Sequence, residues 1–239
     1  MVITGLAWAY LLYMVWGMEN MDVLAAQYFM PAMVNWGPWD LMLVFLMWVI
    51  MMAAMMLPSA EPMIRLYARS AEGQSKHTVG YYTSLFVGGY LLIWSAFSLL
   101  ATLAQWGLLE LSLVTPMMDS ASNWLSGSLL IAAGAFQFSR FRNTCLNKCR
   151  TPMGFLMTEW RPGPQGALIM GLRHGGYCLG CCAMLMLLLF VLGVMNLVWI
   201  LVLTSIVLVE KLLPANMTWP SHLLGVGLIA WGLRYWQLA

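Results

Sequence analysis

The chain has 239 residues, of which 62% are hydrophobic and only 8% are charged, and its mean hydropathy is +0.79. A soluble domain carries about 25% charged residues, so this composition excludes an ordinary soluble protein and predicts an integral membrane protein in contact with a lipid bilayer. The net charge of +2 is small and its charges are scattered, which argues against nucleic acid as a partner.

Apolar runs along the chain predict helices that cross the membrane, because a spanning helix needs about 20 apolar residues. We expect seven spans in a single domain, 1–239, near residues 2–18, 38–57, 79–105, 121–139, 177–195, 196–213 and 220–237. Six spans is the alternative if an end segment lies in the membrane interface. The run 2–18 has no basic residue before it and no small-residue cleavage site, which favours a retained span over a signal peptide. The expected fold class is therefore all-α, a polytopic transmembrane helical bundle.

Basic residues gather in alternate loops of this predicted topology. Ten of the 11 Lys and Arg side chains fall in or directly beside segments 57–78, 140–176 and 214–219, which share one side of the membrane if there are seven spans. The opposite segments carry only acidic charges: Glu19, Asp22, Asp40, Glu110 and Asp119. The positive-inside rule then predicts that the basic loops and the N-terminus are cytoplasmic.

The longest polar interruption is the segment 140–166. It predicts a short amphipathic helix that is broken at Pro152, followed by a turn rich in Pro and Gly at 162–166. Trp160 and Arg161 between them are suited to anchor the segment at the lipid headgroups.

The cysteines all fall on the predicted cytoplasmic side of the membrane. Two lie in the basic loop and three lie in the first turns of the fifth span: Cys145, Cys149, Cys178, Cys181 and Cys182. The cytoplasm is reducing and five is an odd number, so we expect free thiols rather than disulfides.

The spacing of the sulfur side chains indicates a site for a soft metal ion. Cys178, Cys182 and Met186 follow an i, i+4, i+8 line, which places their sulfur atoms on one helix face. The inner half of the second span adds two i+4 rows of methionines, Met47, Met51 and Met55 on one and Met52 and Met56 on the next. This span is expected to end at Pro58, so its methionines lie at the depth of the thiols. Thiolates and thioethers select Cu(I), while Cys together with His would also bind Zn(II), so zinc is the alternative metal.

Neighbouring polar residues complete the predicted site. His174 is the best nitrogen donor, and Arg173 is placed either to balance the negative charge of copper-bound thiolates or to reach the headgroups. Glu210 and Lys211 are expected to pair with each other; otherwise Glu210 would be a ligand on the path of the ion. The candidate metal ligands are Cys178, Cys181, Cys182, His174, Met186, Cys145, Cys149, Met51 and Met55.

Ordinary packing is the alternative explanation for each of these residues. A buried free cysteine behaves as a small hydrophobe, and methionine is an adaptable core filler. The glycines around the thiols have the small-xxx-small spacing of close helix contacts, and His174 could simply contact headgroups. The sequence contains no G-x-S-x-G, P-loop or H-E-x-x-H motif, so no enzyme is expected.

Four motifs together resemble a known family. They are W-x-x-M-M-x-A-M-M-x-P from Trp48, C-L-x-x-C-R-x-P from Cys145, G-x-x-x-G-x-x-C-x-G-C-C from Gly171 and E-K-x-x-P from Glu210. The chain is similar, from about residue 40 to 214, to a bacterial family described as predicted metal-binding integral membrane proteins of unassigned activity. The resemblance implies metal binding at the matching residues, which are Cys145, Cys149, His174, Cys178, Cys181 and Cys182.

The function expected from these observations is copper handling, either transport or delivery to a membrane copper enzyme. A rival hypothesis is a non-catalytic structural subunit or assembly factor of a larger membrane complex, in which the cysteines only pack. A third is a thiol-redox protein that uses Cys178 and Cys181 as a C-x-x-C pair.

Overall fold

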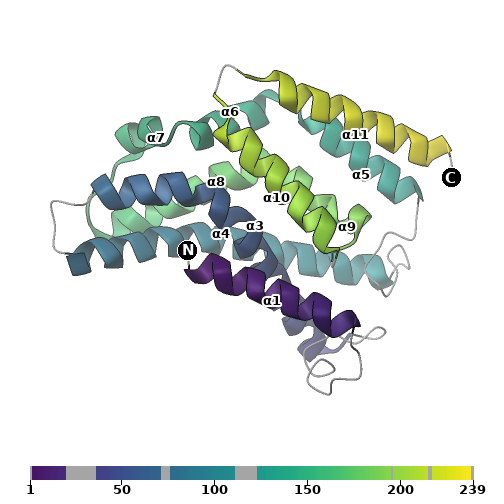
Figure 1. The fold of residues 1–239 in the computed structure, drawn as a ribbon, viewed down its shortest axis with the longest axis horizontal. Helices are drawn as coiled ribbons and strands as arrows, with labels where there is room; N and C mark the ends of the chain where they lie inside the picture. The colour runs from purple at the N-terminus through teal and green to yellow at the C-terminus, as the bar shows by residue number, and fades with distance from the viewer. Residues whose placement is uncertain are drawn as a thin grey trace.

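The protein is seen in a computed structural model that describes residues 2–19, 36–70, 76–110, 123–194, 196–214 and 217–237. The helices in these ranges are α1 (Val2–Glu19), α3 (Pro38–Ser70), α4 (Lys76–Glu110), α5 (Asn123–Phe136), α6 (Arg140–Arg150), α7 (Pro152–Glu159), α8 (Gly163–Leu187), α9 (Leu189–Leu192), α10 (Leu197–Leu212) and α11 (Trp219–Gln237) (Figure 1). No strand occurs in the described ranges, so the predicted all-α class is confirmed.

Three helical stretches are long and apolar enough to cross a membrane: Pro38–Ser70, His77–Glu110 and Gly163–Leu192. Shorter apolar stretches are Val2–Gly17 and Asn123–Phe136. A helix lies at each of the seven predicted positions, but the number of crossings and the side of the N-terminus stay predictions. Asp22, Asp119 and Met195 lie outside the described residues.

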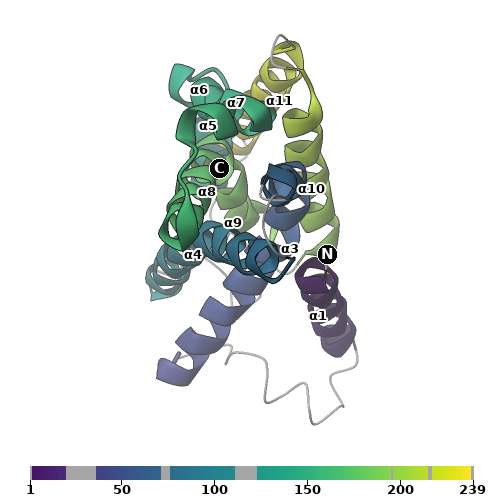
Figure 2. The same cartoon turned by 90° about the vertical axis from the view of Figure 1, so that its left-hand side faces the viewer.

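Helix α3 does not end at Pro58, as the sequence predicted, but continues to Ser70 and changes direction on the way (Figure 2). Proline has no N–H, so Pro58 leaves the carbonyl of Ala54, four residues earlier, without its helical hydrogen bond. The indole of Trp8 in α1 donates to this carbonyl at 3.1 Å. The structure thus satisfies the freed carbonyl from another helix, and Pro58 and Pro62 bend α3 instead of ending it.

Helix α8 begins at Gly163, so most of the predicted turn at 162–166 is already helical. Gly163 has a φ of 82°, a conformation that glycine adopts at little cost, and Pro164 stands in the first turn, where a missing N–H is tolerated. The predicted break at Pro152 is confirmed, because α6 ends at Arg150 and Pro152 opens α7. The early start of α8 places Cys178 near the middle of this 25-residue helix rather than in its first turns.

Glycines bring the backbones of α4 and α8 almost into contact. A Cβ added to Gly171 would overlap the carbonyl oxygen of Phe86, and one added to Gly89 would overlap that of Leu168. Such small residues allow helices to approach closely where lipid supplies no hydrophobic driving force. The close approach places Tyr90, one turn beyond Phe86, against the cysteines of α8.

This contact predicts that alanine substitutions at two glycines of α8 differ strongly in their effect on stability. We expect Gly171→Ala to destabilise the protein by about 1–3 kcal/mol, because the added methyl group overlaps backbone that cannot move away as a side chain would. Gly176→Ala is the matched control, since a Cβ there would meet nothing within 4 Å. Thermal unfolding of the two variants in detergent measures the difference, and equal midpoints would contradict this account of the α4–α8 contact.

Candidate metal centre

The three thiols of α8 lie in the core of the protein. Cys178, Cys181 and Cys182 are 0%, 2% and 2% exposed, and they belong to the same apolar cluster as the methionines of α3 between Met47 and Met56. The thiols of Cys181 and Cys182 donate to the carbonyl of Cys178 at 3.1 and 2.8 Å. All five cysteines of the chain are free and buried.

A methionine of α3 meets these thiols. The sulfur atoms of Cys182 and Met56 lie 3.8 Å apart, which joins two helices that are distant in sequence. Met51 and Met55 are also buried, but they point about 140° and 100° away from Met56 around a regular helix. Met186 is fully buried one turn beyond Cys182. The methionine beside the thiols is therefore Met56, which belongs to the neighbouring row of the two that the sequence shows.

Polar side chains from three other helices surround Cys178. Its sulfur lies 3.0 Å from the hydroxyl of Tyr90 in α4 and 3.0 Å from the ammonium nitrogen of Lys211 in α10. Tyr90 also donates to the carbonyl of Met56 at 3.1 Å, and Lys211 also donates to the hydroxyl of Ser59 in α3 at 2.8 Å. Four helices, α3, α4, α8 and α10, thus converge on one thiol.

The charges beside the thiols differ from those that the sequence predicted. Arg173 does not face the thiols but pairs with Glu159, and its side chain is 44% exposed. Glu210 does not pair with Lys211 but with Arg142, at 2.5 Å. Neighbouring residues of a helix point about 100° apart, so Glu210 and Lys211 reach different partners. The cation at the site is Lys211.

The cysteines of α6 extend the group of thiols along α8. The thiol of Cys149 contacts that of Cys181, and the sulfur of Cys145 packs so closely on Gly180 that a Cβ there would lie 2.7 Å from it. The hydrogen bond to Cys181, and then burial, raise the pKa of the Cys149 thiol well above its ordinary value. A metal ion bound at this thiol would therefore have to displace its proton.

The candidate nitrogen ligand, His174, lies one turn before Cys178 and is 3% exposed, which places it in the core rather than at the headgroups. Its ring packs against three aromatic rings, those of Phe86, Tyr90 and Phe155. Its Nδ1 atom is buried and has no hydrogen-bond partner in the part of the chain that the structure describes. The structure therefore places this imidazole in an aromatic pocket next to the site.

These donors fit a soft ion of low coordination number. Within the described ranges, no group of three or more His, Cys, Asp or Glu side chains could hold a metal ion. Thioethers are donors of a different kind, and two thiols with the thioether of Met56 make a set of sulfur donors of the kind that selects Cu(I).

Three residues of this arrangement were not predicted as part of the site. Ser59 and Tyr90 carry no signal in the sequence, because ordinary spanning helices contain such residues for packing and hydrogen bonding. Lys211 stands in the E-K-x-x-P motif at the end of a predicted span, and a lysine within such a span is itself a signal for function. Because Glu210 stands next to Lys211, an ion pair between them accounted for both charges, and the sequence therefore offered no reason to place Lys211 beside the thiols.

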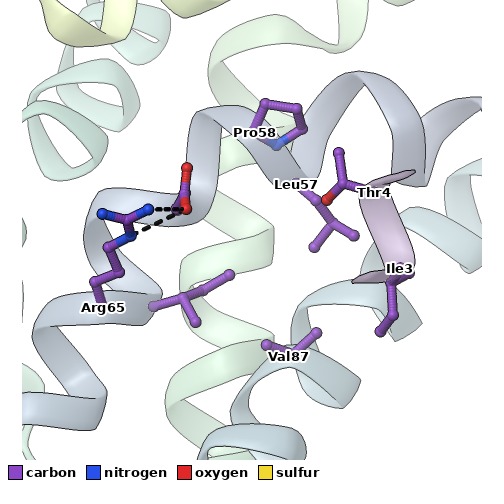
Figure 3. Close-up of a pocket in the computed structure, with 8 residues that line it drawn as sticks. Ile3, Thr4, Leu57, Pro58, Arg65 and Val87 are labelled. Carbon is purple, nitrogen blue, oxygen red and sulfur yellow. Dashed lines mark hydrogen bonds and ion pairs between the residues drawn. The ribbon is translucent and has the colours of Figure 1, made fainter. Parts of the chain in front are cut away.

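A cavity of about 410 Å³ opens beside the bend of α3 (Figure 3). It is lined by Ile3, Thr4, Leu57, Pro58, Glu61, Ile64, Arg65 and Val87. Arg65 donates twice to the carboxylate of Glu61, at 2.9 and 2.6 Å, so the charged part of the lining is an ion pair within α3. The cavity adjoins Leu57 and Pro58, the residues that follow Met56.

The fold and these residues define an all-helical protein with apolar helices and a buried group of soft sulfur donors. A family model described as PpoB2: Copper chaperone matches residues 45–235. The chain therefore belongs to this copper chaperone family, and its role is copper handling without catalysis, as predicted. The family supports copper as the metal and gives no support to zinc. No curated protein and no solved structure matches the chain significantly.

Proposed function

We propose that this protein is an integral membrane copper chaperone that holds Cu(I) between the thiols of α8 and Met56 of α3. The observation that carries the proposal is the contact of Cys182 with Met56, 3.8 Å between their sulfur atoms, across two helices. Copper is the cargo, to be handed to a membrane copper enzyme. Cys178 and Cys182 supply thiolates, and Met56 supplies a thioether that brings no charge into the membrane.

The remaining candidate ligands suggest a path along which the ion exchanges ligands. Cys181 connects the central pair to Cys149, and Cys145 continues the line of sulfur atoms on α6. Since α6 is short and carries four basic residues, we place it at the cytoplasmic surface. Copper would enter there and move inward to Cys178, Cys182 and Met56. His174, Met186, Met51 and Met55 would then be secondary ligands.

Membrane integration in seven spans, with the N-terminus in the cytoplasm of a bacterium, is part of the same proposal. Three long apolar helices and the distribution of basic loops support it. In this orientation the buried thiols lie toward the cytoplasmic side of the membrane. The reducing cytoplasm keeps them free of disulfides and available as ligands.

Metal analysis tests the function directly. We expect protein purified after loading with Cu(I) to retain copper, and a Cys178→Ser/Cys181→Ser/Cys182→Ser variant to lose it while eluting as the same folded species. Equal and near-zero copper in both proteins would refute the proposal. Co-purification of a partner complex that still assembles with the triple variant would favour the structural-subunit hypothesis instead.

A further inference from the structure

Lys211 is a buried cation that has no carboxylate partner among the residues that the structure describes. Lys211 is 8% exposed, and none of the ion pairs within the described ranges includes it. Its bonds go to Ser59 and to the sulfur of Cys178. The adjacent carboxylate of Glu210 is taken by Arg142 and by the hydroxyl of Ser221, at 2.5 and 2.7 Å. The group that faces Lys211 is therefore the sulfur of Cys178, which becomes an anion when it is deprotonated to bind a metal ion.

Burying a charge is costly unless an opposite charge compensates it. A metal ion held by deprotonated Cys178 and Cys182 changes the charge of this pocket by an amount that depends on the ion. Cu(I) with two thiolates carries a net charge of −1, which the ammonium group of Lys211 brings to zero. A divalent ion with the same ligands is neutral, so Lys211 would leave the pocket with an uncompensated charge of +1.

We infer that Lys211 determines the specificity of the site for monovalent over divalent soft ions. This inference rests on the proposed function, because it takes Cys178 and Cys182 as the ligands. Lys211 is a positioning residue: it binds no metal, but its fixed positive charge stabilises the monovalent complex and destabilises the divalent one. Ser59, fixed at the bend of α3, holds the ammonium group against Cys178.

The test compares Cu(I) with Cd(II), a soft ion that also prefers thiolates but carries one more charge. Affinities of the full-length protein in detergent are measured by anaerobic competition with a chromogenic chelator for Cu(I) and by thiolate charge-transfer absorption for Cd(II). We expect Lys211→Met to weaken Cu(I) binding roughly 10- to 100-fold, the usual effect of removing a group that supports metal ligands. Cd(II) binding should stay equal or strengthen, so the Cu(I)/Cd(II) selectivity falls.

Three further variants separate charge from packing. Lys211→Arg keeps the positive charge, so this variant should retain most of the Cu(I)/Cd(II) selectivity that Lys211→Met loses. Lys148→Met makes the same change on α6, away from Cys178, and should leave the Cu(I)/Cd(II) selectivity at the wild-type value. Ser59→Ala removes only the hydroxyl that holds the ammonium group. It should lower the Cu(I)/Cd(II) selectivity, as Lys211→Met does, but by a smaller factor. It serves as the deciding variant if Lys211→Met does not fold.

The outcomes distinguish this inference from the proposed function. The copper site itself is refuted if the wild-type protein binds no Cu(I), or if the Cys182→Ser variant binds Cu(I) with the wild-type affinity. If wild-type protein binds Cu(I) but Lys211→Met or Ser59→Ala leaves the ratio of the two affinities unchanged, the charge-based specificity of Lys211 is overturned while the copper site stands.

Discussion

Cys182→Ser is expected to lower the affinity for Cu(I) by more than about 100-fold, a larger loss than removal of a supporting group causes. The hydroxyl of serine is a hard donor and does not replace a thiolate toward a soft ion. Cys182 also makes the contact with Met56, at 3.8 Å, so the substitution removes a sulfur atom that joins α8 to α3. Competition with a chromogenic Cu(I) chelator measures the loss.

A pair of methionine variants shows whether this effect belongs to the proposed site. Met56→Leu keeps the size of an apolar side chain but removes its thioether, and should weaken Cu(I) binding, though less than Cys182→Ser does. Met63→Leu makes the same change on the same helix in a second apolar cluster that contains no cysteine. Equal affinities of the Met56→Leu and Met63→Leu variants would contradict a role for Met56 as a ligand.

Arg142→Met is expected to destabilise the protein by about 3–5 kcal/mol, since it leaves a buried carboxylate without its cation. Arg142 is fully buried and donates to Glu210 in α10, while Ser221 of α11 donates to the other oxygen of the same carboxylate. Arg150 donates to the backbone carbonyl of Glu210 at 2.7 Å. These bonds fix α6 and α11 to α10, and so they also fix the position of Lys211.

The measurement is thermal unfolding in detergent with two comparisons. Arg65→Met breaks the ion pair with Glu61, whose side chains are 63% and 31% exposed, and should cost at most about 1 kcal/mol. The double variant Arg142→Met/Glu210→Met removes both buried charges and should recover much of the stability lost by Arg142→Met alone. Similar losses for Arg142→Met and Arg65→Met would show that the buried network is not what holds these helices together.

Local sequence patterns determined the helices of this protein. Apolar runs predicted the all-α class and the positions of the main helices, because lipid-compatible segments must satisfy their backbone hydrogen bonds internally. Pro152 correctly marked the break between α6 and α7. The spacing of Cys178 and Cys182 placed both thiols on one side of α8, where the structure finds them buried.

Contacts between distant segments decided the rest. Pro58 leaves the carbonyl of Ala54 without its helical donor. Trp8 of α1 donates to this carbonyl instead, so α3 continues past Pro58. Met56 rather than Met51 meets the thiols because the rotation of α3 against α8 depends on how the helices pack, which periodicity within one helix does not specify. Lys211 faces Cys178 because Arg142, far away in sequence, occupies the carboxylate of Glu210. The sequence by itself determined where the helices lie, apart from the end of α3 and the start of α8, and which residues carry sulfur. The tertiary structure alone decided which of those sulfur atoms meet, since pairing between helices is set by packing and charge across the whole fold.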